Sequence, residues 1–134
     1  MRLLIDTHFA LWLASDPGKL TIAETALLES ADSEVSVSAV SIWELRLKWN
    51  SLHRSGARKG AAAPEDVLAA LENDIGCMML PLTAAHAAVV LQVPLQHNDP
   101  FDGLLLAQAQ AQAEGLRLLT RDRALVGHPL AVAA

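Results

Sequence analysis

The sequence predicts an α/β fold with a mostly parallel central sheet. Short apolar or alternating runs of strand length recur along all 134 residues, and segments with helical start and stop signals separate them. Strands that alternate with helices are typical of βαβ units, whose strands run parallel. The composition, 52% hydrophobic and 19% charged, is that of a compact domain rather than a disordered chain. We therefore expect residues 1–134 to form one domain with four to five strands flanked by helices.

The first thirty residues predict one strand and two helices. Leu3–Ile5 is fully apolar, as the central strands of parallel sheets are. A helical stretch follows over 6–13 and ends at the Asp-Pro-Gly turn over 16–18. A second helix is predicted over 21–30, because its threonine N-cap and Glu24 have the spacing of a capping box.

The middle of the chain predicts a second strand, two helices and a loop between them. Val35–Ser38 alternates like a strand, and Ser41 is expected to cap a helix that runs through Lys48. Residues 51–63 have the composition of a mobile, basic loop. The next helix is expected to begin at Pro64, since proline is favoured at the first helical position.

The second half predicts three more strands and two helices. Cys77–Leu80 has the pattern of a buried strand, and a threonine-capped helix follows over 83–91. A long helix rich in alanine and leucine is expected over 99–114, with a glycine directly after it. Strands over 116–119 and 130–132 complete the predicted sheet, with a short turn or helix between them.

The net charge of −5 argues against a protein that coats nucleic acid by bulk electrostatics. It does not exclude a nuclease, because metal-binding carboxylates themselves lower the net charge. Five of the ten Lys and Arg residues are concentrated in one stretch, namely Arg46, Lys48, Arg54, Arg58 and Lys59. This stretch is suited to binding phosphates, and it is equally compatible with a solvated loop or with a contact to an acidic segment of a protein partner.

Cysteine use and the N-terminal segment indicate a cytoplasmic protein. Cys77 is the only cysteine, so the chain forms no internal disulfide. Arg2 and Asp6 interrupt the apolar N-terminus, which excludes a membrane-spanning helix there and fits poorly with a signal peptide. We therefore expect no membrane association.

Acidic residues stand at the edges of four apolar runs. They are Asp6, Glu44, Asp99, Asp102 and Asp122. A carboxylate beside a buried strand or helix is costly unless a cation or a donor meets it. Asp6 and Asp122 follow predicted parallel strands, and ligands bind beyond the carboxyl ends of such strands. Clustered carboxylates suit Mg²⁺, with Mn²⁺ as a substitute, so the pattern predicts a metal-dependent phosphodiesterase.

Each of these acids also has a purely structural explanation. Asp6 and Asp99 can cap the helices that follow them. Glu44 can lie on the solvated face of its helix, and the helix dipole can account for Asp102. Asp122 can pair with a neighbouring arginine or cap a turn. It is the joint pattern of all five that favours a functional role.

Two histidines and two threonines lie beside the predicted site. His8 and His97 are candidates for proton transfer, with ordinary hydrogen bonding as the alternative. Thr7 and Thr120 are candidates for ordering a water molecule, with capping as the alternative.

Four motifs carry a resemblance to a known family. In chain order they are Leu3-Leu4-Ile5-Asp6-Thr7-His8, Ser41-Ile42-Trp43-Glu44-Leu45, His97-Asn98-Asp99-Pro100-Phe101-Asp102-Gly103-Leu104 and Leu119-Thr120-Arg121-Asp122. Together they resemble the PIN-domain family and, within it, the VapC-type toxins of bacterial toxin–antitoxin pairs. The resemblance covers essentially the whole chain.

The resemblance implies a three-layer α/β sandwich with an acidic Mg²⁺- or Mn²⁺-dependent site and endoribonuclease activity. It implies an RNA substrate, a homodimer, and a VapB-type antitoxin whose C-terminal segment enters or covers the active-site groove. By position, Asp6 and Asp102 match the direct metal ligands, and Asp99 is a third candidate ligand. Glu44 and Asp122 match acids that hold water molecules, which makes all five candidate catalytic residues.

One position departs from the family pattern. The Asp-Pro-Phe-Asp subgroup commonly has arginine after its second aspartate, whereas this chain has Gly103 there. Loss of that arginine would weaken contacts to substrate or antitoxin. A second interpretation therefore stays open, in which the chain is a catalytically weak or inactive PIN-like binding module that acts through its protein partner.

Overall fold

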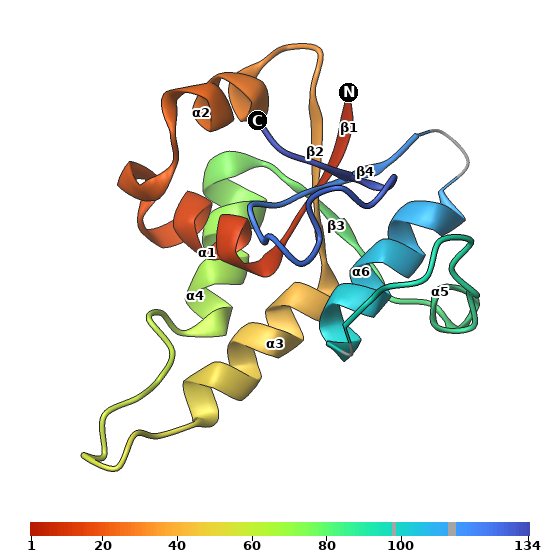
Figure 1. Cartoon of the computed structure of the whole chain (residues 1–134). Coiled ribbons are helices and arrows are strands. Elements are labelled where there is room, and N and C mark those ends of the chain that lie inside the picture. The colour runs from red at the N-terminus through yellow and green to blue at the C-terminus, as the bar shows by residue number, and fades with distance from the viewer. Residues whose placement is uncertain (98, 113–114) are drawn as a thin grey trace.

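The computed structural model describes residues 1–97, 99–112 and 115–134, and its centre is a parallel sheet (Figure 1). The strands are β1 (Arg2–Ile5), β2 (Glu34–Ser38), β3 (Met78–Leu80), β4 (Arg117–Leu119) and β5 (Ala131–Val132). All four pairings are parallel, in the order β3-β2-β1-β4-β5. The predicted α/β class and the parallel sheet are confirmed. Because β1 lies between β2 and β4, the two halves of the chain meet at the centre of the sheet.

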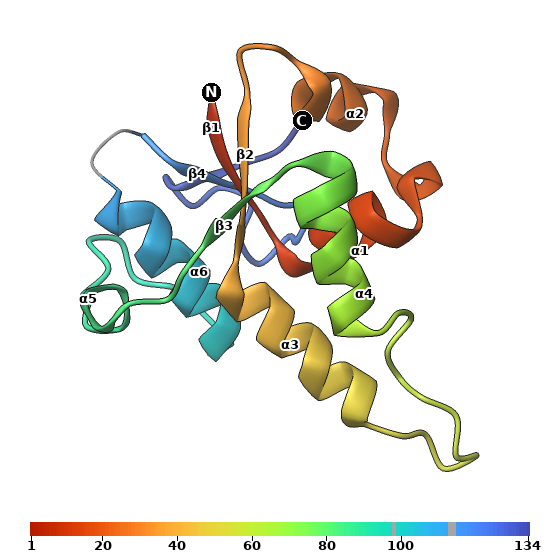
Figure 2. The same ribbon diagram turned by 180° about the vertical axis from the view of Figure 1, so that it is seen from behind.

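Helices cover both faces of this sheet, which gives the predicted three layers (Figures 1 and 2). The helices are α1 (Thr7–Ser15), α2 (Ile22–Glu29), α3 (Ala39–Asn50), α4 (Pro64–Ala69), α5 (Ala84–Ala87) and α6 (Pro100–Ala111), together with a 3₁₀ turn over Pro17–Lys19 and a π-helical continuation of α4 over Ala70–Ile75. Helices α1, α2 and α4 lie on one face, and α5 and α6 lie on the other. No helix in the described part of the chain combines the length and apolarity needed to cross a bilayer.

The alternation of side chains along β1 divides the hydrophobic core in two. Leu3 and Ile5 pack with Phe9 of α1 and Leu71 on one face of the sheet. Leu4 points the other way and packs against α6. Successive side chains of a strand face opposite sides, so a fully apolar strand needs apolar cover on both faces. This explains why Leu3–Ile5 reads as a continuous apolar run.

Several local signals act as the sequence predicts. Thr21 and Glu24 form the reciprocal capping box at the start of α2. Pro64 occupies the first turn of α4, and Asp99 caps α6 ahead of Pro100. Each of these signals acts over three residues or fewer, which is the range over which a sequence pattern is most informative.

Four of the predicted elements differ in the structure. The side chain of Ser38, not Ser41, caps α3, since the helix begins directly where β2 ends. Helix α5 stops at Ala87 rather than at residue 91. Helix α6 ends at Ala111, and the predicted end at Glu114 lies outside the described residues. Strand β3 lies at the edge of the sheet, which leaves Met78 63% exposed instead of buried.

Candidate active site at the carboxyl edge of the sheet

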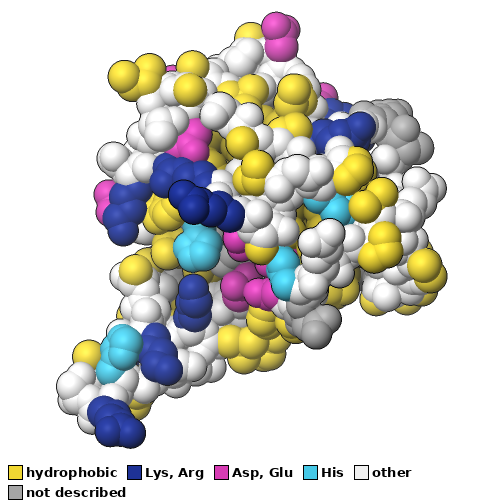
Figure 3. Space-filling view, in the orientation of Figure 1, with side chains coloured by type: hydrophobic (Ala, Val, Ile, Leu, Met, Phe, Trp, Pro, Cys, Tyr) yellow, Lys and Arg dark blue, Asp and Glu magenta, His cyan; other side chains and the backbone are white. Residues whose placement is uncertain are grey.

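The predicted acids come from four parts of the chain that meet at one edge of the sheet. Asp6 follows β1, Asp122 follows β4, Glu44 lies on α3 after β2, and Asp99 and Asp102 stand at the start of α6. Figure 3 shows acidic side chains gathered near the middle of one face, with histidine side chains on either side of them. Parallel strands place all their carboxyl ends at the same edge, so the topology brings these segments together.

Asp6 is held rigidly at the end of β1. Its side chain is buried, with only 6% of the residue exposed. The Phe9 N–H donates to Oδ1 at 2.9 Å, and the Thr120 hydroxyl donates to Oδ2 at 2.7 Å. Burial raises the pKa of Asp6, while the Phe9 and Thr120 hydrogen bonds act against that rise. Asp6 therefore caps α1 and faces the acidic cluster as well, so its two interpretations are compatible.

Glu44 is turned inward, not toward solvent. The Thr7 hydroxyl donates to Glu44 Oε1 at 2.7 Å, and Thr7 Oγ1 lies 3.1 Å from Ser41 Oγ. Thr7 and Glu44 are 37 residues apart, so this contact joins α1 to α3. A helical residue on the solvated face would not make such a bond. Glu44 is therefore half-buried and held by Thr7, and does not lie on a fully solvated helix face.

The start of α6 carries two acids with different surroundings. Asp99 Oδ1 accepts from the N–H groups of Phe101 and Asp102, at 2.9 and 3.3 Å. His97 Nδ1 accepts from the Asp99 N–H at 3.3 Å, which places the imidazole proton of a neutral ring on Nε2. That nitrogen lies 3.6 Å from Asp102 Oδ2. His97 is thus oriented toward Asp102.

The electrostatics of Asp102 show that the acids converge. Burial, followed by the charges of Asp99, Asp122 and Glu44, raises the pKa of Asp102 to about 6, while the charge of His97 acts in the opposite direction. Four carboxylates from three segments of the chain are therefore close enough to oppose the ionisation of Asp102. Repulsion of this kind is typical of sites that bind a cation.

Thr120 links two of the acids, and its role is clear only from the structure. Its hydroxyl donates to Asp6 and accepts from the Asp122 N–H at 3.0 Å. Asp122 Oδ1 also accepts from the Ala124 N–H, so the predicted turn cap is present. Arg121 turns away from Asp122 and pairs with Glu24, at 2.6 and 2.7 Å. The expected pairing of Asp122 with Arg121 is therefore wrong.

The donor chemistry of the cluster fits a hard divalent cation. Within the described ranges, none of the five acids has a Lys or Arg side chain at ion-pair distance. Hydrogen bonds and the charges of His8 and His97 act against this negative charge, and carboxylate oxygens are the ligands that Mg²⁺ and Mn²⁺ prefer. Among the same residues, no three acidic, His or Cys side chains lie close enough together to hold one ion as they stand. Hydrogen bonds from protein donors instead fix the side chains of Asp6, Glu44 and Asp99 in their present orientations.

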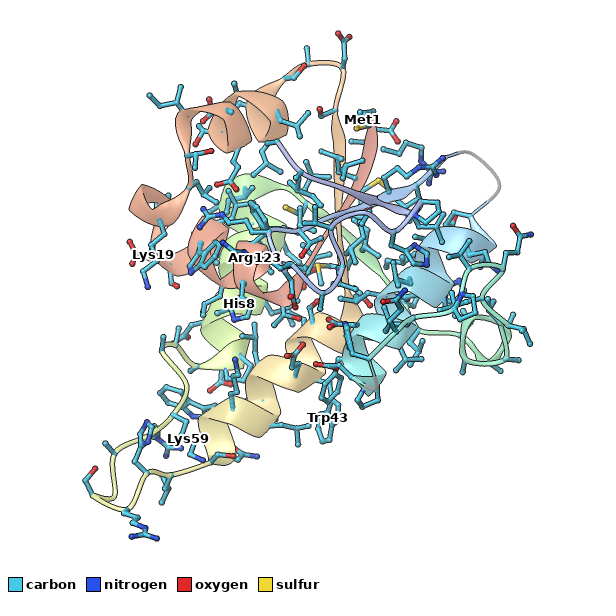
Figure 4. All side chains as sticks on the ribbon, in the orientation of Figure 1. Met1, His8, Lys19, Trp43, Lys59 and Arg123 are labelled. Carbon is cyan, nitrogen blue, oxygen red and sulfur yellow. The ribbon has the colours of Figure 1, made fainter. Side chains whose placement is uncertain are left out.

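Cavities lined by described residues lie near these elements, and two of them border Asp6 or α3. One, of about 240 Å³, opens beside Asp6 and Asp122 and is walled by His8, Phe9, Trp12 and Arg121. The larger, of about 710 Å³, is an apolar groove between α3, α4 and the β3 edge, and it contains no member of the acidic cluster. Trp43 borders this groove and is 57% exposed (Figure 4).

Gly103 has open space around its α-carbon. A Cβ at this position would have no atom within 4 Å apart from its own helix, and the backbone has negative φ. An arginine would therefore fit where the family subgroup has one. Its absence leaves the cluster without that neighbouring cation.

Comparison with known proteins identifies the family. Residues 3–127 match the PIN domain family. Ribonuclease VapC22 of Mycobacterium tuberculosis is 32% identical over 125 residues, which cover 93% of this chain and 90% of the relative. A chain in the crystal structure of VapBC2 from Rickettsia felis bound to a DNA fragment from their promoter shares the fold, with a TM-score of 0.59, 12% identity and coverage of 100% and 98%. The chain belongs to the PIN-domain family and is of the VapC type.

Proposed function

We propose that this chain is a Mg²⁺-dependent endoribonuclease of the VapC type, with Mn²⁺ as an alternative ion and residues 1–134 acting as one PIN-like domain. The observation that carries the proposal is the position of Asp6, Glu44, Asp99, Asp102 and Asp122 at the carboxyl edge of the sheet, where burial, followed by the neighbouring acidic charges, raises the pKa of Asp102 to about 6. A relative with 32% identity carries the name ribonuclease, which supports the same reaction class. A cation at this edge would relieve the repulsion.

We assign Asp6, Asp99 and Asp102 as metal ligands. A divalent cation held by them supplies Lewis acidity and neutralises charge at the scissile phosphate. Thr120 and the Phe9 N–H fix the orientation of Asp6, so that its position is set before any ligand arrives. Glu44 and Asp122 are assigned to hold the attacking water by hydrogen bonds, with Glu44 fixed by Thr7.

The family relation supports an RNA substrate and a VapB-type antitoxin whose C-terminal segment enters or covers the acidic site. It also supports a location in the cytoplasm. It also supports a homodimer. The exposed side chains of Trp43 and Leu47, 57% and 39% exposed, give α3 an apolar surface that a second copy would cover. Sedimentation analysis of the purified chain tests this assembly, and a monomer at micromolar concentration would contradict it.

The test of the reaction is cleavage of a labelled single-stranded RNA. We expect cleavage with Mg²⁺ or Mn²⁺ and none with EDTA. Asp6→Asn keeps the shape of the side chain and removes its charge, so we expect a loss of about 100-fold or more, as for removal of one electrostatic stabiliser elsewhere.

Asp16→Asn is the matched control, since Asp16 is an exposed acid outside the cluster, paired with Lys19. It should cleave RNA as the parent does. If Asp6→Asn retains parental activity, the assignment of the site is wrong.

The second candidate function is a binding module with a weak or inactive site, and Gly103 is the observation that favours it. It predicts that the purified protein leaves every RNA intact and still binds its partner tightly. In that case we would measure RNA cleavage by Gly103→Arg, which restores the arginine of the family subgroup.

A further inference from the structure

A cationic projection extends from the edge of the sheet that carries the acids. It consists of residues 46–60, the second half of α3 and the hairpin after it, and is named here the basic arm. Figures 1 and 3 show it reaching away from the sheet, with Lys, Arg and His side chains along it. The hairpin is closed by a bridge between Leu52 and Arg58.

The charge of the basic arm is opposite to that of the rest of the molecule. It holds five of the ten Lys and Arg residues of a chain whose net charge is −5, and no acid lies between Glu44 and Glu65 in the sequence. Arg46 pairs with Glu65. Across the described residues, no ion pair engages Lys48, Arg54 or Lys59. Three cations are therefore free to meet an anion.

Internal contacts give the arm a defined shape. Arg58 lies over the Trp49 ring at 4.5 Å and donates to the Trp49 carbonyl at 2.9 Å. Backbone bonds run from His53 N–H to Ala57 and from Lys59 N–H to Ser51. Gly60 packs so tightly that a Cβ there would lie 2.9 Å from the Trp49 Cα. Lys48, Arg54 and Lys59 therefore lie on a helix end and hairpin whose conformation is fixed by internal contacts.

The arm continues directly from the acidic cluster. Glu44 and Lys48 are four residues apart on α3, so they share one helix face, about 6 Å apart along the axis. Figure 4 shows Lys59 farther along the same projection, away from His8 and Arg123 beside the site. A linear polyanion that passes through the acidic site can therefore follow cations along the arm.

We propose that the basic arm binds the phosphate backbone of single-stranded RNA on one side of the cleaved bond, through Lys48, Arg54 and Lys59. This inference rests on the proposed nuclease function. An acidic molecule repels RNA overall, so a long substrate needs a local row of cations to stay bound. Because the arm continues from Glu44, an RNA strand whose cleaved bond lies at the acids reaches the arm directly, and binding of an acidic polypeptide in its place is one outcome of the test.

The test variant is Lys48→Gln/Arg54→Gln/Lys59→Gln, in which all three side chains are exposed. The matched control is Arg2→Gln/Lys19→Gln/Arg117→Gln, which removes the same charge. Arg2 and Arg117 begin β1 and β4, at the edge of the sheet opposite the acids. Binding of a labelled 20-nucleotide RNA is measured by fluorescence anisotropy in EDTA at several salt concentrations, and thermal melting verifies that each variant is folded.

We expect the arm variant to bind the 20-nucleotide RNA more weakly by roughly 10- to 100-fold at 0.15 M salt. The slope of log affinity against log salt should fall by about 2, because three phosphate contacts to a single strand are lost. With Mg²⁺, cleavage of a four-nucleotide RNA should be reduced less in the arm variant than cleavage of the 20-nucleotide RNA, since the shorter strand reaches Lys48 but not the hairpin.

The outcomes separate the two proposals. Equal RNA affinity and equal salt slope for the parent and the arm variant overturn the arm proposal, even if the parent cleaves RNA. Arm-dependent binding without any cleavage supports the arm and contradicts the nuclease. If the arm variant keeps its RNA affinity but loses binding of polyglutamate, the arm serves an acidic polypeptide, and the RNA proposal is overturned.

Discussion

Asp102 combines burial with three acidic neighbours, and this has a cost for the free protein. Its carboxyl is only partly exposed and stands near Asp99, Asp122 and Glu44. Each neighbour disfavours its ionised form, as does burial. His97 is the one side chain whose charge acts in the other direction. A residue placed in this way is poorly suited to stability and well suited to binding a cation.

We expect Asp102→Asn to stabilise the metal-free protein at pH 7. The folded chain keeps the Asp102 proton up to about pH 6, whereas the unfolded chain releases it near 3.8, so stability falls as the pH rises between these values. Asparagine stays neutral and does not incur that loss. The free energy of unfolding of the variant should therefore be higher than that of the parent by about 1 kcal/mol, after allowance for screening by solvent. Thermal melting of the parent and Asp102→Asn in EDTA, at pH 7 and pH 3.5, measures this difference in stability.

The gain should be present at pH 7 and absent at pH 3.5. Glu72→Gln, an exposed acid outside the cluster, is the control and should change little at either pH. A lower melting temperature for Asp102→Asn at pH 7 would show that the carboxylate is already compensated within the protein.

At the scale of elements, the start of α6 serves structure and chemistry with one residue. Asp99 satisfies two N–H groups of the first turn, and the same turn presents Asp102 to the cluster. The N-terminal end of a helix also carries partial positive charge, which favours acids there. A cap at this position therefore fixes both the helix and the direction of Asp102.

Paired substitutions at Asp99 separate its two roles. Asp99→Ala should lower the free energy of unfolding by about 1 kcal/mol, because the cap is lost, whereas Asp99→Ser should retain most of it. Both variants lose a proposed ligand, so both should bind Mg²⁺ more weakly. Melting curves and calorimetric Mg²⁺ titrations give the two readouts. Full Mg²⁺ affinity in Asp99→Ser would limit Asp99 to capping.

At the scale of the whole molecule, a single contact ties α2 to the segment after β4. Glu24 is buried in the structure, and Arg121 pairs with it across 97 residues of sequence. Arg121 also lies over the rings of Trp12 and Phe9, at 4.3 and 5.5 Å. This cluster fixes the chain directly before Asp122, and its arginine and aromatic side chains wall the cavity beside Asp6 and Asp122.

We expect this contact to make the protein sensitive to acid. The Arg121 hydrogen bond is the main reason that the pKa of Glu24 lies below its usual 4.5. The stabilisation is thus complete above pH 4.5 and is lost as the pH falls through the lower pKa of the folded protein. Glu24→Gln should cost about 1–2 kcal/mol at pH 7, and less in strong acid. Glu29→Gln, exposed at the end of the same helix, is the control. An equal cost at pH 7 and pH 2 would contradict the role of the ion pair.

The sequence by itself determined the order of most strands and helices and the capping roles of Thr21, Glu24 and Asp99. The strand patterns of β1 and β2, the capping box of Glu24 and the cap at Asp99 all depend on residues within a few positions, where propensity and hydrogen bonding act directly. The motifs also indicated the family. Such short-range patterns carry no information on which distant side chains meet.

Only the tertiary structure decided how the site is assembled. The contacts of Thr7 with Glu44 and of Thr120 with Asp6 join residues 37 and 114 positions apart. They exist because the sheet order places β1 between β2 and β4, so that three carboxyl ends meet at one edge. Burial at that edge raises the pKa of both Asp6 and Asp102, and at Asp102 the charges of Asp99, Asp122 and Glu44 add to it. The distinct character of Asp102 comes from its surroundings, which no stretch of sequence specifies alone.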